Sequence, residues 1–171
     1  LGYEIFYPWN KTKKLWQELT GPGKVAPAGL GARDILRLEM GYSLYGHELN
    51  EDISVLESGL SRFIDFNKEF IGKNALLLQQ KHGMKRKIVG LESINRKSPR
   101  QDQKVFLESG KEIGIITSGT FSPAVNKGIG LAFVDMESAV AGKNILFGDD
   151  KSKSPAVISS KIFFKNGSLK N

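Results

Sequence analysis

The sequence contains no cysteine and only two histidines among its 171 residues. The absence of cysteine excludes a disulfide framework and thiolate metal ligands. His47 and His82 lie far apart in the sequence and lack the spacing of paired metal ligands, so we expect no zinc or iron site. No apolar run approaches the roughly 20 residues that a membrane-spanning helix needs, so we expect no membrane segment.

Motifs of the common nucleotide-dependent and hydrolytic enzymes are also missing. There is no phosphate-binding P-loop and no Gly-rich dinucleotide fingerprint, and the glycines between Gly110 and Gly119 fit a hairpin better. Ser98, Ser118 and Ser122 have no histidine close in sequence, so a serine hydrolase is not favoured. Composition and spacing alone therefore define no catalytic group.

Charge is unevenly distributed along the chain. Residues 1–80 hold nine Lys/Arg against ten Asp/Glu, for −1, whereas residues 81–171 hold sixteen against eight, for +8. The basic residues are scattered through strand-like sequence, without the aromatic cluster or helix-turn-helix pattern of nucleic-acid-binding domains. A solvated basic face is the simplest interpretation, an acidic protein or polyanionic cofactor comes second, and nucleic acid third.

The first half of the sequence has mixed strand and helix patterns. Residues 1–7 alternate with period two and predict a strand, which Pro8 ends. This opening has no initiator Met and no signal-like segment, so we expect the chain to start inside a domain, as a fragment of a longer protein. Apolar spacing and stop residues predict helices over 11–19, 30–40 and 73–82, with a partly buried helix or strand and turn over 54–66.

The second half changes to short apolar or alternating runs separated by Gly, Ser, Asn or Asp at roughly ten-residue spacing, which is typical of a small antiparallel barrel or sandwich. The expected strands are 87–91, 104–107, 111–117, 127–134, 144–147 and 156–164. We place the domain boundary near residue 84, with domains 1–84 and 85–171.

Two charged residues of the first half could bind a heterocycle. Glu4 lies on the expected first strand, and a carboxylate can accept two hydrogen bonds from the edge of a pterin or purine. Arg33 lies near the start of an expected helix, and its guanidinium offers a fork or a stacking plane to such a ring. A structural Glu–Arg ion pair, or two separate surface charges, is the simpler alternative on these residues alone.

Several segments in order along the chain resemble one enzyme family, the tetrahydrofolate-dependent T-protein (aminomethyltransferase) of the glycine cleavage system. Gly2-Tyr3-Glu4-Ile5 is similar to its Gly-aromatic-Glu strand, and Ala32-Arg33-Asp34 opens a segment that is similar to its Ala-Arg-Asp helix. Segments 41–49, 70–73, 117–123 and 128–134 also match family motifs.

The resemblance implies an α+β fold: a partial α/β domain of ferredoxin-like type that binds folate, over residues 1–84, followed by an antiparallel β-barrel over 85–171. It implies that Glu4 and Arg33 bind the pterin end of tetrahydrofolate and that Tyr42 lines the same cavity. A residue near the C-terminus, Leu169 or Lys170, occupies the place of a further folate contact. The family's catalytic aspartate lies on an N-terminal half that has no match here, so no catalytic residue is expected in this chain.

The resemblance also implies the reaction. The intact enzyme is expected to take an aminomethyl group from the lipoyl arm of the H-protein, release ammonia and leave the one-carbon unit on tetrahydrofolate. The expected partners are lipoylated H-protein and the N-terminal half of the same protein, without nucleic acid, membrane or metal. The expected compartment is the bacterial cytoplasm, or the mitochondrial matrix in a eukaryote. This chain alone should be inactive.

Three alternatives stay open. The first is a folate-binding relative of the same fold with another role, such as iron–sulfur assembly or oxidative demethylation of glycine derivatives. The former would carry a cysteine motif, which is absent here, and the latter a fused flavin domain. The second is a barrel that only binds other proteins and has no folate affinity. The third is an RNA-binding barrel.

Overall fold

The computed structural model describes residues 2–22, 24–149 and 151–166. The chain divides into two compact units, Leu1–Arg33 and Asp34–Asn171, which are described separately below. The sequence-based boundary near residue 84 is a different division, based on the change in hydrophobic pattern, and it stays a prediction.

The first unit contains the 3-10 helix η1 (Trp9–Lys11) and the helix α1 (Thr12–Thr20), and helix α2 (Leu30–Glu39) begins within it. The helices predicted over 11–19 and 30–40 are thus present within one residue at each end. The strand predicted over residues 1–7 is not found among the described residues 2–7. A strand exists only where a neighbour pairs with its backbone, and no backbone hydrogen bond is formed within this segment or from it to another described residue.

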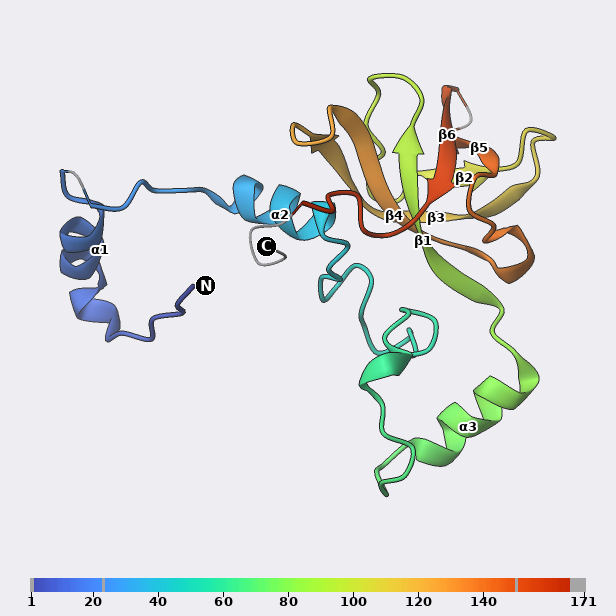
Figure 1. The fold of residues 1–171 in the computed structure, drawn as a ribbon, viewed down its shortest axis with the longest axis horizontal. Coiled ribbons are helices and arrows are strands. Elements are labelled where there is room, and N and C mark those ends of the chain that lie inside the picture. The colour runs from blue at the N-terminus through green and yellow to red at the C-terminus, as the bar shows by residue number, and fades with distance from the viewer. Residues whose placement is uncertain (1, 23, 150, 167–171) are drawn as a thin grey trace. The chain divides into compact units, whose positions relative to one another are not determined.

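The second unit is built on a closed antiparallel barrel of six strands in the order β1-β4-β3-β2-β5-β6 (Figure 1). The prediction of a small antiparallel barrel is confirmed. Closure pairs the first strand with the last, Leu91 opposite Ile158, and so leaves no free sheet edge. The strands are β1 (Arg86–Ser93), β2 (Lys104–Phe106), β3 (Glu112–Ser122), β4 (Lys127–Asp135), β5 (Asn144–Gly148) and β6 (Lys153–Ser159).

The barrel interior is filled by small and branched apolar side chains with Phe147 fully buried among them. A second cluster lies outside the barrel wall, where Leu38 of α2 packs with Ile129, Leu131 and Phe133 of β4. Strand β4 is therefore buried on both faces, which explains why its sequence is almost continuously apolar instead of alternating.

The remaining elements of the second unit are short. They are η2 (Ser61–Phe63), α3 (Lys73–His82) and η3 (Met136–Ser138). Helix α3 has the predicted bounds, but none of its residues is buried. After β6 the chain leaves the barrel, and the backbone N–H groups of Phe163 and Phe164 both donate to the carbonyl oxygen of Glu39 at the end of α2. The last strand was predicted over 156–164, but β6 spans Lys153–Ser159, so it begins and ends earlier than predicted.

Candidate functional site

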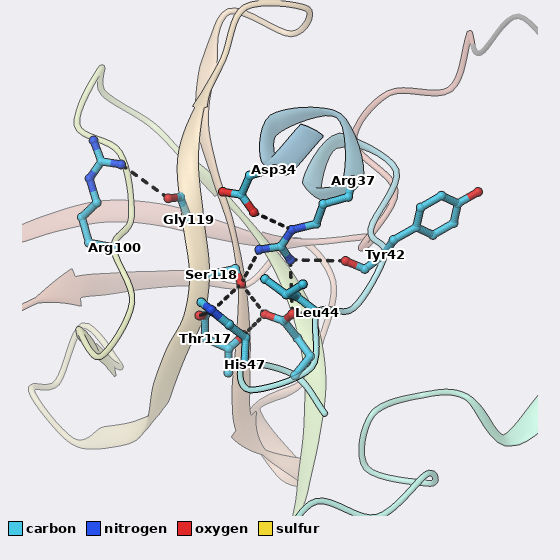
Figure 2. Close-up of polar contacts among 10 residues, drawn as sticks. Asp34, Arg37, Tyr42, Leu44, His47, Arg100, Thr117, Ser118 and Gly119 are labelled. Atoms are coloured by element: carbon cyan, nitrogen blue, oxygen red, sulfur yellow. Dashed lines mark hydrogen bonds and ion pairs between the residues drawn. The ribbon is translucent and has the colours of Figure 1, made fainter. Parts of the chain in front are cut away.

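A fully buried carboxylate, that of Glu48, is the centre of a polar network. Its hydrogen-bond partners Arg37, Leu44, Thr117 and Ser118 are shown in Figure 2. Its Oε2 atom accepts hydrogen bonds from the backbone N–H of Leu44 at 2.9 Å and from Arg37 Nη1 at 3.2 Å. Its Oε1 atom accepts from Thr117 Oγ1 at 2.5 Å and from Ser118 Oγ at 2.6 Å. Four donors therefore satisfy both oxygen atoms of the Glu48 carboxylate and offset the cost of its burial.

Adjacent residues of β3 both reach Glu48 because the strand is irregular there. In a regular strand, Thr117 and Ser118 would point to opposite faces of the sheet. The register of β3 against β4 shifts between Ile116 and Ser118, and this β-bulge turns both hydroxyls toward the same carboxylate oxygen. The bulge is thus the backbone feature that positions the polar network.

Arg37 connects this network to helix α2. Its Nη2 atom donates to Ser118 Oγ at 2.9 Å, and its Nε atom donates to Asp34 Oδ1 at 2.8 Å. The side chain is only 13% exposed, so its ion pair with Glu48 is shielded from water. A planar guanidinium with several donors suits this role, since it bridges a helix, a loop and a strand at once. The network therefore fixes the residue 34–39 part of α2 against β3.

The hydrogen bonding of His47 defines its tautomer. Its Nδ1 atom lies 2.9 Å from the carbonyl oxygen of Thr117, which can only accept, so Nδ1 carries the hydrogen. The side chain of His47 is half-buried against β3. A pocket of about 220 Å³ adjoins it, with Arg86, Asp102 and Phe133 among the lining residues.

Ser118, His47 and Glu48 lie close together but do not form a hydrolytic triad. Ser118 Oγ is 3.4 Å from His47 Nδ1. That nitrogen already donates to a carbonyl and has no free lone pair with which to accept the serine proton. Ser118 Oγ instead donates to Glu48 and is 3% exposed as a residue, out of reach of a substrate. The arrangement is that of a structural clamp.

The structure places the predicted folate-binding residues on the surface of their own units. Glu4 and Arg33 belong to the first unit, both are exposed, and neither side chain forms a hydrogen bond or ion pair with any residue in the described ranges 2–22, 24–149 and 151–166. Tyr42 belongs to the second unit, and its ring is directed away from the Glu48 network in Figure 2. The side chains of Glu4 and Arg33 form no ion pair with each other, and the folate role of all three residues stays a prediction. Leu169 and Lys170 lie outside the described residues.

The carboxyl-terminal tail contributes one titratable group of note. Lys161 donates from Nζ to the carbonyl oxygen of Ser58 at 3.2 Å. Burial lowers the pKa of Lys161 below its ordinary value, and the nearby charges of Arg62 and Lys87 act in the same direction, while Glu48 opposes them.

Among the described residues, no helix is long and apolar enough to cross a membrane, and no group of acidic or histidine side chains could hold a metal ion.

Sequence inspection missed the Glu48 clamp because its members are distant in the chain. Glu48 and Thr117 are 69 positions apart, and no periodic pattern links them. One signal was present: Glu48 and Thr117-Ser118 each lie in segments that carry the family resemblance. Such matching polar residues could have been paired as a buried acid and its hydroxyl donors.

Comparison with known proteins shows two family matches in sequence order. Residues 1–68 match the GCVT N-terminal domain, and residues 86–165 match the glycine cleavage T-protein C-terminal barrel domain. The second match covers the closed barrel. The two matches together cover most of the chain, and the chain belongs to the glycine cleavage T-protein family.

Individual relatives agree with this assignment. The aminomethyltransferase of Caldanaerobacter subterraneus subsp. tengcongensis is 46% identical over 168 residues, covering 96% of this chain and 45% of the relative. That of Aquifex aeolicus is 47% identical over 144 residues, covering 84% and 39%. The crystal structure of glycine cleavage system aminomethyltransferase T from Bartonella henselae has a TM-score of 0.84 at 28% identity, over 92% of this chain and 45% of that one. The chain thus spans about half the length of the relatives it matches.

Proposed function

We propose that this chain is the folate-binding and barrel part of a tetrahydrofolate-dependent aminomethyltransferase of glycine cleavage. The observation that carries the proposal is the family membership, which extends along nearly the whole chain and includes relatives that are named aminomethyltransferases. Because the chain spans 45% of such a relative, the complete reaction is proposed to need a polypeptide equivalent to the remainder.

The proposed reaction starts from an aminomethyl group that is attached to a lipoyl sulfur of the H-protein. Two folate nitrogens form bonds to its methylene carbon, while the carbon–nitrogen bond to ammonia and the carbon–sulfur bond to the lipoyl thiol break. The two protons lost by the folate nitrogens balance those gained by the amine and the thiolate. A carboxylate that moves these protons is proposed to come from the complementary polypeptide, as general acid and base.

The residues of this chain are proposed to bind and orient the folate. Glu4 would accept hydrogen bonds from the amino-pyrimidine edge of the pterin, and Arg33 would donate to or stack on the ring. Both side chains are exposed and free of protein partners within the described part of the chain, which leaves their hydrogen-bonding groups available. Tyr42, 61% exposed, would line the same cavity.

Electrostatics supports the proposed partners. Residues 81–171 carry a net charge of +8 (sixteen Lys/Arg against eight Asp/Glu), which would attract the anionic glutamyl tail of folate and an acidic carrier protein. The relatives compared above are bacterial, which supports the bacterial cytoplasm as the compartment.

Ammonia release is the direct test. The chain is mixed with lipoylated and aminomethylated H-protein, tetrahydrofolate and the portion of the Caldanaerobacter relative that this chain does not match. We expect ammonia only when all components are present. Turnover by the 171-residue chain alone would contradict the proposal, as would inactivity of the mixture when the relative's own two halves are active together.

The folate role of single residues is tested in that complex by calorimetry with tetrahydrofolate. Glu4→Gln and Arg33→Ala should each weaken folate binding by roughly 30-fold, because a buried charged hydrogen bond loses one partner. Glu18→Gln is the matched control, since its carboxylate belongs to the polar face of α1, and it should leave affinity unchanged. Unchanged affinity in both Glu4→Gln and Arg33→Ala would make these residues structural.

The alternative within the same family is a folate-binding protein with another reaction. Oxidative demethylation of a glycine derivative would produce formaldehyde or a reduced flavin instead of ammonia. Measuring these products in the same mixture separates the two functions.

A further inference from the structure

The pocket beside His47 contains polar groups that the buried Glu48 network leaves unused. Its volume is about 220 Å³, and all of its lining residues belong to the second unit. Phe133 of β4 is part of its apolar lining, and His47, Arg86 and Asp102 line it as well. Because a cavity of about 150 Å³ holds a benzene ring, a small organic molecule fits in this pocket.

His47 contributes a hydrogen-bond acceptor. Its Nδ1–H group donates to the carbonyl oxygen of Thr117 at 2.9 Å, so Nε2 carries the lone pair of the neutral ring. Nε2 forms no hydrogen bond with any residue in the described part of the chain. Since Nδ1 is held against β3, Nε2 is the ring nitrogen that remains available to a ligand.

Asp102 contributes a carboxylate on a turn that is fixed to β3. Its φ of 67° lies in the left-handed region, which Asp and Asn tolerate better than most residues with a side chain. Its N–H donates to the carbonyl of Ile116 at 2.9 Å, and the N–H of Ile116 donates to the carbonyl of Gln103 at 2.8 Å. The carboxylate itself forms no hydrogen bond or ion pair with a described residue. It can therefore receive a cation without rearrangement of the backbone.

Arg86 contributes a cationic donor whose position is also fixed. Its Nε atom donates to Glu57 Oε1 at 3.0 Å, and its Nη2 atom donates to the carbonyl of Asp52 at 3.3 Å. The guanidinium carbon lies 5.0 Å from the centroid of the Phe133 ring. Nη1 has no hydrogen-bond partner within residues 2–22, 24–149 and 151–166, which leaves its N–H groups for an anion.

We propose that this pocket binds a free α-amino acid in its zwitterionic form. The ammonium group donates to the carboxylate of Asp102 and to Nε2 of His47, and the ligand carboxylate accepts from Nη1 of Arg86. A ligand with only a negative charge would be repelled by Asp102, and one with only a positive charge by Arg86, so the pocket selects a molecule that carries both. None of the proposed folate-binding residues lines the pocket, so this site is additional to the proposed folate site.

An NMR titration of the 171-residue chain with glycine tests the proposal, because glycine carries only the two groups that the site is proposed to recognise. The chain has two histidines, and His82 at the end of α3 does not line the pocket, so its ring signals are an internal reference. We expect the Nε2 and Hε1 signals of His47 to shift saturably while those of His82 stay in place. Acetate and methylammonium, which carry one charge each, should bind at least about tenfold more weakly.

Two variants test the contacts by calorimetry with glycine. Asp102→Asn removes the charge and keeps a residue that tolerates positive φ, so it should weaken binding by at least about tenfold. His47→Asn keeps an N–H group for the carbonyl of Thr117 but lacks Nε2, so it should weaken binding about fivefold. Glu108→Gln is the matched control, since it removes a negative charge in the turn between β2 and β3, away from the pocket lining, and should change affinity by less than about twofold.

Far-UV circular dichroism checks that each variant keeps the barrel. The proposal is overturned if glycine leaves the His47 signals unmoved, or if acetate or methylammonium binds as tightly as glycine. It is also overturned if Asp102→Asn binds glycine as the wild type does. The experiment uses neither folate nor H-protein, so its failure would leave the proposed reaction unaffected.

Discussion

The barrel and the first unit use similar residues in opposite ways. In the barrel, Phe147 and Ile158 are at most 1% exposed, whereas in the first unit Phe6 is 89% and Ile5 57% exposed. Both regions have apolar residues at strand spacing, but only the barrel contains all the strands that its hydrogen bonds need. The difference shows that a period-two pattern encodes which face is apolar, while the partner strand decides whether a strand forms.

The largest expected effect tests that contrast directly. Phe147→Ala should lower the free energy of unfolding by about 3–5 kcal/mol, because it removes a buried ring from a closed core. Phe6→Ala, the same change at an exposed position, should alter it by less than about 0.5 kcal/mol. Urea denaturation followed by far-UV circular dichroism measures both. Equal effects would mean that the first unit already has a core of its own.

The second prediction compares two carboxylates. Glu48→Gln should destabilise the chain by roughly 2–4 kcal/mol. Each carboxylate oxygen of Glu48 accepts two hydrogen bonds, so either orientation of the glutamine amide places its NH₂ group against two donors. Glu18→Gln on α1 should cost less than about 0.5 kcal/mol, since its ion pair with Lys14 is exposed. A small loss for Glu48→Gln in the same denaturation experiment would show that the clamp adds little stability.

The third compares two glycines. A Cβ atom on Gly90 of β1 would lie 2.2 Å from the carbonyl oxygen of Ser160, so Gly90→Ala should displace the tail and cost about 1–3 kcal/mol. Gly31 of α2 has no atom within 4 Å of such a Cβ, and Gly31→Ala should instead favour the helix by up to about 1 kcal/mol. Thermal unfolding distinguishes the two signs, and destabilisation by both substitutions would contradict this account.

The smallest expected effect concerns pH. Burial lowers the pKa of Lys161, so the folded chain loses this proton before the unfolded chain does. In the interval below the ordinary lysine pKa of 10.5, the unfolded state binds more protons, and stability contributed by this group rises with pH. The unfolding free energy of the wild type relative to Lys161→Gln should therefore increase from pH 7 to pH 10. A constant difference would show that Lys161 is charged equally in both states.

Much of the secondary structure could be predicted from local patterns. Helix α3 begins and ends at the predicted residues, because Gly72 and Gly83 on either side adopt positive φ and stop the helix. Strand β6 begins at Lys153 and contains Pro155, whereas the predicted strand begins at residue 156. Pro155 lies opposite Leu146 of β5 and next to the end of β1, where its carbonyl oxygen accepts a hydrogen bond from the backbone N–H of Ile94 and it has no N–H of its own to donate.

The candidate site was less accessible to sequence analysis. The residue types of Glu4 and Arg33 fit a heterocycle, an ion pair or two separate surface charges equally, and only the family resemblance predicts a folate role for them. The Glu48 clamp depends on a bulge at Thr117 and on a helix, a loop and a strand meeting in space. No local sequence pattern predicts the bulge or the contact between these three elements, because both depend on the tertiary structure.

The hydrogen bonds from Phe163 and Phe164 to the carbonyl of Glu39 have a consequence for the topology of the second unit. They connect Glu39, near the start of the second unit, with the segment that follows strand β6. The backbone between these residues therefore forms a closed ring of more than a hundred residues. Entropy lost in closing such a ring grows only slowly with its length. A permuted chain that joins these two ends by a short linker and opens in a hairpin turn should therefore retain the barrel.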